Sequence, residues 1–371
     1  MVQVDLITGF LGAGKTTFLR RYVRYLVAQG HNVCILENDF GAVNVDAMLV
    51  QDLLGPNCDL ETISGGCDCD THQRRMRTKL IAMAMRGFDR VVVEPSGIFD
   101  VDEFFDVLRD DPLDRWYHIG NVIAIVDAML PETLSPQAEY VLASETANAG
   151  RVLVSRTQLA GQQQTAAAVA HLTRALEGCK CSRRFAPEEI ITKDWARLTD
   201  ADLAAIAACG CRQASCEKLH FDEHEAFSSL CFLEQHLTLQ QLQAAADHLF
   251  ADAACGHVLR VKGFAPDPQG TTGWLELNAT AAGRTLEPIP QGQDVLIVIG
   301  EGLDNADAGQ GILKACIYIA DPAAVIHKGY LHSAVLSQRE QEHADNEKNE
   351  RKSQPPVNEE EKDKGANNFD Q

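Results

Sequence analysis

The sequence has no long hydrophobic run and comparatively little positive charge. None of its segments reaches the ~18 uninterrupted apolar residues that a membrane-spanning helix requires, so we expect no membrane association. Its 371 residues include 33 lysines and arginines against 53 aspartates and glutamates, which gives a formal net charge of -20. Such a surface repels phosphate backbones, so nucleic acid is not an expected partner.

Several familiar signals are also missing. Residues 1–7 lead directly into an apolar strand without a basic region or a cleavage site, so we expect no secretory signal and a cytoplasmic location. No dinucleotide-binding fingerprint and no nucleophile–base pairing occur. None of the 12 cysteines forms a C-x-x-C pair. In a reducing compartment we expect these cysteines to be mostly thiols.

Apolar runs and helical stretches alternate in the first half of the chain. The runs with strand character are residues 2–8, 33–37, 90–94, 122–127 and 151–155. Helical stretches lie between them, at 15–28, 74–86, 101–108 and 165–176. This alternation predicts an α/β fold, with a parallel sheet covered by helices on both faces.

The pattern changes after about residue 200. Residues 195–216 are rich in alanine and predict a helix, and from residue 226 strand and helix signals follow an α+β order. The tail is rich in Glu, Lys, Asn and Gln and cannot bury enough surface to offset its ordering entropy. We therefore expect a first domain at 1–200, a Cys/His-containing linker at 201–225, a smaller α+β C-terminal domain at 226–330 and a disordered charged tail at 338–371.

Residues 9–16 read Gly-Phe-Leu-Gly-Ala-Gly-Lys-Thr and fit G-x-x-x-x-G-K-[ST] in full, between a strand and a helix. This context predicts a P-loop domain that binds a nucleoside triphosphate with Mg²⁺. Lys15 is expected to reach the β- and γ-phosphates, Thr16 to bind Mg²⁺ and Thr17 to contact the α-phosphate. The expected phosphate-binding residues are Gly9, Gly12, Ala13, Gly14, Lys15, Thr16 and Thr17.

A P-loop enzyme also needs an acidic residue at the end of a nearby strand, which holds Mg²⁺ through water. Residues 91–97 read Val-Val-Val-Glu-Pro-Ser-Gly and supply Glu94 in that position. Gly97 follows at a place where its N–H could donate to a γ-phosphate. Glu94 is therefore the predicted water-mediated Mg²⁺ ligand.

Two further carboxylates follow the strand at 33–37. Glu37 and Asp39 could order a water molecule, a metal or a switch loop, or form a simple acidic turn. No residue is an obvious water-activating base, and these two are the best candidates. The expected catalytic residues are Lys15, Glu37, Asp39 and Glu94.

Four segments together resemble the CobW-like family of P-loop GTPases, relatives of the HypB and UreG metallochaperones. They are residues 9–17 (GFLGAGKTT), 37–41 (ENDFG), 65–69 (GGCDC) and 94–97 (EPSG). The likeness extends over roughly residues 1–325. It implies GTP-gated delivery of a transition metal, zinc or cobalt, to a client metalloprotein. It also implies that the C-terminal domain contacts a partner or a second protomer, as in a homodimer.

The cysteine motif departs from the family pattern C-x-C-C. Here it reads Cys67-Asp68-Cys69-Asp70, so a carboxylate replaces the third thiolate. Because zinc accepts sulfur, nitrogen and oxygen ligands, Cys67, Cys69 and Asp70 could bind Zn²⁺ or Co²⁺, with Glu37 or His72 completing the site. The alternative is a pair of loop cysteines without a metal.

The base-recognition motif also differs from the family pattern. Guanine-specific members carry N-K-x-D, whereas the equivalent stretch here is Ser155-Arg156-Thr157-Gln158. The resemblance places Ser155, Arg156 and Gln158 beside the base, with the Arg156 stem along it. Losing a charged bidentate contact costs about 1.5–3 kcal/mol. We therefore expect weakened guanine selectivity, with GTP first and ATP close behind.

A second cysteine group consists of Cys209, Cys211 and Cys216, near His220 and His224. These donors could bind zinc, or the segment could be a linker that merely carries cysteines. On this sequence the first hypothesis is a slow metal-handling P-loop GTPase. The alternatives are a regulatory binder that responds to nucleotide or metal without hydrolysis, an ATP-using P-loop protein, and a small-molecule kinase that uses the same P-loop.

Overall fold

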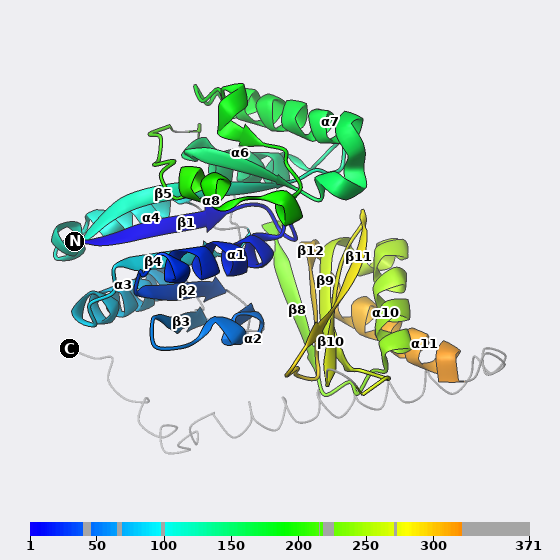
Figure 1. The fold of residues 1–371 in the computed structure, drawn as a ribbon. Coiled ribbons are helices and arrows are strands. Elements are labelled where there is room, and N and C mark those ends of the chain that lie inside the picture. The colour runs from blue at the N-terminus through cyan, green and yellow to red at the C-terminus, as the bar shows by residue number, and fades with distance from the viewer. Residues whose placement is uncertain are drawn as a thin grey trace, which may run out of the picture. The chain divides into compact units, whose positions relative to one another are not determined.

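A seven-stranded sheet forms the centre of the first domain (Figure 1). The computed structural model describes residues 1–39, 46–64, 69–97, 101–214, 216–217, 226–270 and 273–320. The strand order is β3-β2-β4-β1-β5-β6-β7, and every neighbouring pair is parallel. The strands are β1 (Val2–Thr8), β2 (Val33–Asp39), β3 (Cys58–Ser64), β4 (Arg90–Pro95), β5 (Tyr117–Asp127), β6 (Arg151–Ser155) and β7 (Ile190–Ile191).

Both faces of this sheet are buried, which explains why its central strands are almost continuously apolar. In β4, Val91 and Val93 belong to one hydrophobic cluster while Val92 belongs to the other. The fold class expected from the sequence is therefore confirmed. The helices of the first domain are α1 (Lys15–Ala28), α2 (Asp46–Leu49), α3 (Cys69–Met85), α4 (Val101–Arg109), α5 (Leu113–Trp116), α6 (Pro136–Ala147), α7 (Thr157–Gly178) and α8 (Asp200–Ile206).

The helices divide between the two faces. Helices α1 and α8 pack on one face, through residues such as Phe18, Leu19 and Leu203. Helices α3, α4, α6 and α7 pack on the other, through residues such as Leu80 and Phe104. Since α8 joins the first domain's core, the segment after residue 200 is built onto this domain. The proposed boundaries of the four domains remain predictions.

Of the helix predicted over 195–216, only α8 (Asp200–Ile206) is α-helical, and the prediction is wrong before Asp200 and after Ile206. Gly210 has φ 69° and Val122 N donates to Gly210 O at 3.0 Å, while Cys211 forms a β-bridge with Ala149. These contacts hold the segment in an extended form along the first domain, which a helix could not follow. The alanine content alone predicted more helix than the packing allows.

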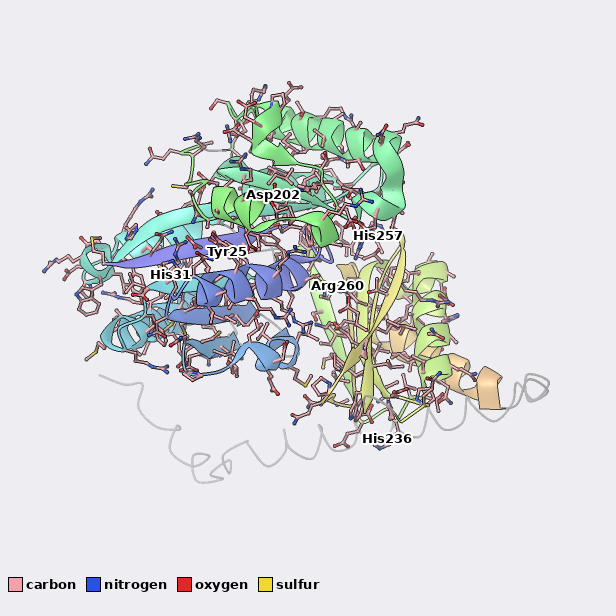
Figure 2. All side chains as sticks on the ribbon, viewed as in Figure 1. Tyr25, His31, Asp202, His236, His257 and Arg260 are labelled. Atoms are coloured by element: carbon pink, nitrogen blue, oxygen red, sulfur yellow. The ribbon has the colours of Figure 1, made fainter. Side chains whose placement is uncertain are left out.

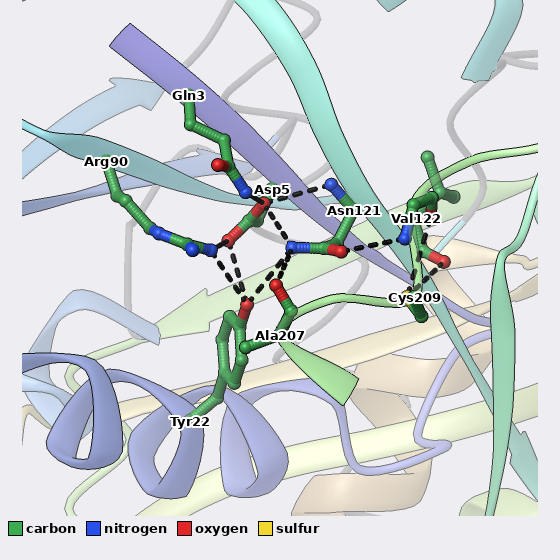
Figure 3. A network of polar contacts seen from close by, with 9 residues as sticks. Gln3, Asp5, Tyr22, Arg90, Asn121, Val122, Ala207 and Cys209 are labelled. Atoms are coloured by element: carbon green, nitrogen blue, oxygen red, sulfur yellow. Dashed lines mark hydrogen bonds and ion pairs between the residues drawn. The ribbon is translucent and has the colours of Figure 1, made fainter. Parts of the chain in front are cut away.

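A buried polar network fixes α1 and this extended segment to the sheet (Figure 3). The carboxylate of Asp5 is fully buried on β1. It accepts hydrogen bonds from Tyr22 Oη at 2.8 Å, Arg90 Nη1 at 2.7 Å and Asn121 Nδ2 at 2.8 Å. Asn121 Oδ1 in turn accepts from Gly210 N at 2.9 Å. These donors compensate the burial of the carboxylate group, so the network holds the helix that carries the P-loop lysine.

The C-terminal region forms a five-stranded sheet in the order β11-β10-β9-β12-β8, in which all neighbouring pairs are antiparallel. Both sheets lie within one compact unit, Met1–Cys316. No helix among the described residues is long and apolar enough to cross a membrane. The elements are β8 (Ser228–Leu233), α10 (Leu239–Ala251), β9 (His257–Pro266), β10 (Trp274–Thr280), β11 (Gly283–Ile289), β12 (Val295–Glu301) and α11 (Asn305–Ala320).

One face of this second sheet is apolar and the other is partly polar. Val261, Leu277 and Val298 point to the hydrophobic cluster that also contains residues of α10 and α11. Because side chains alternate along a strand, Arg260 and Lys262 of β9 point to the opposite face. That polar face lines the cavities described below.

Candidate functional site

The loop between β1 and α1 takes a backbone shape that only glycine supports at two positions. Gly9 has φ 142°, and a Cβ there would lie 2.3 Å from Ile125 O. Gly14, which precedes α1, has φ 100°. Both values lie in the region that L side chains rarely adopt, so the chain turns tightly here and leads into the helix N-terminus. That terminus supplies free N–H groups and the positive end of the helix dipole, which favour a phosphate.

Lys15 lies inside this loop, with only 6% of its surface exposed. Its Nζ donates a hydrogen bond to Gly9 O at 2.8 Å, so the ammonium group points back across the loop. Gly97 approaches the same group, because a Cβ there would lie 2.9 Å from Lys15 Nζ and 2.7 Å from Leu11 N. A glycine at position 97 therefore allows the backbone after β4 to pass close to the phosphate loop.

Thr16 and Glu94 meet at the mouth of the loop. Thr16 Oγ1 donates to Glu94 Oε1 at 2.8 Å, and Glu94 is 5% exposed. A hydroxyl and a carboxylate are oxygen donors, the type of ligand that Mg²⁺ prefers, and Mg²⁺ sites usually add only one or two carboxylates to substrate phosphates and waters. The two residues therefore fit a magnesium ion bound together with a nucleotide.

Two cavities adjoin this loop. The larger has a volume of about 300 Å³ and the smaller about 50 Å³. Ten of the predicted site residues line the larger one: Gly12, Ala13, Gly14, Lys15, Thr16, Thr17, Glu94, Ser155, Arg156 and Gln158. The predicted residues that line the smaller one are Lys15, Glu37, Glu94 and Gly97. The side chains of Asp39, Cys69 and Asp70, and the whole of Cys67, lie outside the described residues.

Arg156 makes contacts within the protein at the edge of the large cavity. Its guanidinium pairs with Asp127, and its Nη2 donates to Gly12 O at 3.0 Å. Burial raises the pKa of the Asp127 carboxyl, while the charge of Arg156 acts in the opposite direction. Arg156 thus joins the end of β5 to the phosphate loop, in addition to lining the cavity.

Two cavity residues near the predicted base end were missed from the sequence, Asp194 and Trp195. The Trp195 ring lies 3.5 Å from the position of a Cβ on Gly14 and meets Phe18 edge to face, with centroids 5.6 Å apart. Its Nε1 is buried without a hydrogen-bond partner among the described residues. Trp195 belongs to a short turn far along the chain from the P-loop, so no local motif marks it.

A known protein family matches the part of the chain that carries this site. Residues 3–182 match the family model of the CobW/HypB/UreG nucleotide-binding domain. The first domain belongs to the CobW/HypB/UreG family. The match spans the strands and helices that carry Lys15, Thr16, Glu94 and Gln158.

Curated relatives of the CobW/HypB/UreG domain include proteins named for zinc. The zinc chaperone YjiA of Escherichia coli is 31% identical over 173 residues, covering 44% of this chain and 52% of the relative. The zinc chaperone YeiR of the same organism is 30% identical over 131 residues, covering 35% and 39%. The zinc-regulated GTPase metalloprotein activator 1 of Schizosaccharomyces pombe is 26% identical over 164 residues, covering 43% and 39%. The matched segments thus span about half the length of these relatives, or less.

Among solved structures, the Zn(II)-bound YjiA GTPase from E. coli is 21% identical to this chain. That match covers 85% of this chain and 98% of the solved one, with a TM-score of 0.33. The hydrogenase maturation factor HypB from Archaeoglobus fulgidus is 16% identical, covers 48% and 75%, and has a TM-score of 0.30. At these scores the two likenesses add nothing to the fold described above.

The second cysteine group lies against the CobW/HypB/UreG domain. Burial raises the pKa of the Cys209 thiol to about 12, and it also raises the pKa of Cys211 and Cys216. In the part of the chain that the structure describes, no three His, Cys, Asp or Glu side chains are grouped closely enough to hold a metal. Cys209, Cys211 and Cys216 therefore form no metal site by themselves. His220 and His224 lie outside the described residues.

Proposed function

We propose that this protein is a Mg²⁺-dependent GTP-binding metallochaperone that hydrolyses GTP slowly and couples its nucleotide state to binding and delivery of a transition metal. The observation that carries the proposal is the cavity that gathers Lys15, Thr16 and Glu94 at the N-terminus of α1. Cationic, hydroxyl and carboxylate groups meet there in the combination that a nucleotide phosphate with its magnesium requires.

The chemistry follows from charge placement. During phosphoryl transfer, negative charge is spread over the oxygens of the transferred group, and preorganised donors stabilise it. Lys15 and the loop N–H groups provide such donors inside a partly enclosed cavity. Thr16 and Glu94 would hold Mg²⁺. When bound, the ion would neutralise part of the negative charge of the phosphates.

Turnover should be slow because the described part of the site has no evident group that activates water. Glu37 lies at the end of β2, is 2% exposed and lines the small cavity with Lys15 and Gly97. It is the best-placed described candidate for orienting a water molecule, and Asp39 follows it in the chain.

The nucleotide is proposed to be GTP, with ATP as the competitor. Relatives named as GTPases favour guanine, whereas the neutral Gln158 in the large cavity removes the charged contact that guanine prefers. This protein therefore discriminates between guanine and adenine less strongly than a GTPase that carries the N-K-x-D motif.

The metal cargo is proposed to be zinc or cobalt, with zinc first because the relatives carry zinc in their names. Cys67, Cys69 and Asp70 would bind it, with Glu37 or His72 completing the site. Two thiolates with carboxylate oxygen form an acceptable zinc ligand set. Delivery would be to a client metalloprotein, and the C-terminal domain would supply contacts with that client or with a second copy of the chain.

Release of inorganic phosphate from GTP, with and without Mg²⁺, tests the enzymatic part. Slow Mg²⁺-dependent release without an added acceptor is expected. Tight nucleotide binding without any release would instead favour a regulatory binder. Release only in the presence of an added acceptor molecule would favour a small-molecule kinase.

A further inference from the structure

Arg260 is the one cationic residue of the C-terminal sheet that lines both cavities without an anionic partner among the described residues. It lies on β9 at the side of the C-terminal sheet that faces the first domain (Figure 2). Its Nε donates to Asn278 Oδ1 at 3.1 Å, which orients the guanidinium. Its neighbour Lys262 also lines the small cavity but is paired with Glu276 at 3.2 Å.

Arg260 reaches the phosphate loop itself. A Cβ on Gly12 would lie 3.9 Å from Arg260 Cδ and 3.0 Å from Thr280 Cγ2, so β9 and β10 touch the turn of the loop. Among the described residues, Lys15, Glu94 and Arg260 line both cavities. Lys15 and Glu94 are the residues expected at the γ-phosphate and its magnesium, so Arg260 lies at the same end of the site.

A second unpaired group points to the same place. Asn38 lines the small cavity with Arg260, is 2% exposed and has no hydrogen-bond partner for either Nδ2 or Oδ1 among the described residues. A buried amide left unpaired costs free energy, as does a half-buried guanidinium without an anion. Anionic oxygens of a ligand would accept hydrogen bonds from the Arg260 guanidinium and from Asn38 Nδ2.

We propose that Arg260 binds the terminal phosphate of the bound nucleoside triphosphate, so that the C-terminal domain distinguishes a triphosphate from a diphosphate. The proposal rests on the nucleotide-binding function proposed above. A guanidinium offers several N–H donors in a planar fork that matches phosphate oxygens. Loss of the terminal phosphate removes the anion from Arg260 and weakens the link between β9 and the P-loop.

The test compares Arg260→Ala with wild type in the full chain with Mg²⁺, using GDP and a non-hydrolysable GTP analogue. Loss of a charged contact is expected to weaken the analogue about 10- to 100-fold and to leave GDP within about twofold. Arg260→Lys, which keeps the charge but not the fork, should weaken the analogue by less. The control is Arg284→Ala, on β11 of the same sheet, whose guanidinium pairs with Asp247 at 2.7 Å outside the cavity; it should change neither affinity.

Hydrogen exchange supplies a readout that does not depend on affinity. The analogue should protect amides of β9 and β10 more than GDP does in wild type, and this difference should vanish in Arg260→Ala. Equal losses for both nucleotides, or no loss for either, would overturn the role of Arg260 while leaving the proposed function intact. Wild type that binds neither nucleotide would overturn both.

Discussion

Thr16 Oγ1 donates a hydrogen bond of 2.8 Å to Glu94 Oε1, which joins the first turn of α1 to the end of β4 across 78 positions of sequence. The contact brings a P-loop hydroxyl and a strand-end carboxylate to one point. It follows from the parallel pairing of β1 with β4, because the carboxyl ends of parallel strands meet at one edge of the sheet. The proposed function depends on this edge.

Glu94→Gln keeps the size of the side chain and removes its charge. The Mg²⁺ concentration for half-maximal binding of a GTP analogue should rise about tenfold or more, because a charge-assisted contact contributes about 1.5–3 kcal/mol. A Mg²⁺ titration followed by fluorescent nucleotide binding measures this. Glu61→Gln is the control, since Glu61 on β3 pairs with Lys79 and Arg86 instead. A midpoint unchanged in both variants would remove Glu94 from the magnesium site.

Lys15→Ala should weaken binding of the GTP analogue by about 100-fold or more. The side chain is almost fully buried in the loop and supplies several charge-assisted contacts to phosphate, each contributing about 1.5–3 kcal/mol. Calorimetric titration gives the affinity directly. Lys180→Ala, which removes an exposed lysine paired with Glu217, is the matched control and should bind normally. Equal affinity of Lys15→Ala and wild type would show that this loop is not the nucleotide site.

Gln158→Asp should restore preference for guanine. A carboxylate accepts from two guanine N–H groups and repels no donor of that base, so the ratio of GTP to ATP affinity should rise about 10- to 100-fold. Competition between the two nucleotides measures the ratio. Gln158→Asn, which has the size of aspartate without its charge, is the control. If both variants give the wild-type ratio, residue 158 does not contact the base.

Stability should fall at alkaline pH because buried thiols resist ionisation. Burial raises the pKa of Cys34 to about 12 and that of Cys58 to about 11, against about 8.5 in an unfolded chain. Since the folded state prefers the protonated thiol, this contribution is complete below about pH 8.5 and is lost as the pH rises toward those higher values. At pH 9.5 each thiol ionises in the unfolded chain but not in the folded one. This should lower the free energy of unfolding by about 1.4 kcal/mol per thiol relative to pH 7.5.

Urea unfolding of Cys34→Ala at the two pH values isolates one thiol. The drop in unfolding free energy between pH 7.5 and 9.5 should be about 1.4 kcal/mol smaller than in wild type. Val33→Ala truncates a neighbouring buried residue and should lower stability equally at both pH values. An identical drop in Cys34→Ala and wild type would contradict the account of a buried, protonated thiol.

Much of the first domain follows from the sequence because its signals are local. The helix expected at 15–28 is observed as α1 (Lys15–Ala28), between the P-loop glycine at 14 and Gly30, which has φ 89°. The strands at 2–8 and 151–155 are also observed with the expected bounds. In each case a dense apolar run bounded by turn residues determines the element without help from distant contacts.

The edge strands could not be predicted in the same way. β3 (Cys58–Ser64) carries Asp59 and Glu61, whose charges pair with Lys79 on α3 and with Arg86, which directly follows that helix. β11 (Gly283–Ile289) is exposed along almost its whole length. Both strands exist because a neighbouring strand offers backbone hydrogen bonds, and their polar side chains conceal that in the sequence.

The residues of the site also differ in whether a local sequence pattern predicts them. The P-loop, Glu94 and Gln158 lie in short motifs, so their shared cavity could be predicted from the sequence. Trp195 and Arg260 reach that cavity from elements far along the chain. Only the packing of η3 (Trp195–Arg197) and β9 reveals them, because neither residue belongs to a local pattern that indicates nucleotide binding.

The central claim is that nucleotide state and metal binding are coupled. It is tested most directly by titrating Zn²⁺ and Co²⁺ into metal-free protein with and without Mg²⁺ and a non-hydrolysable GTP analogue. The titration is repeated with Cys67→Ser/Cys69→Ser and with the control Cys209→Ser/Cys211→Ser, which removes a pair of the same spacing. The account predicts a metal affinity that changes with nucleotide and falls only in the first double variant. A metal affinity that ignores the nucleotide and survives loss of Cys67 and Cys69 would contradict it.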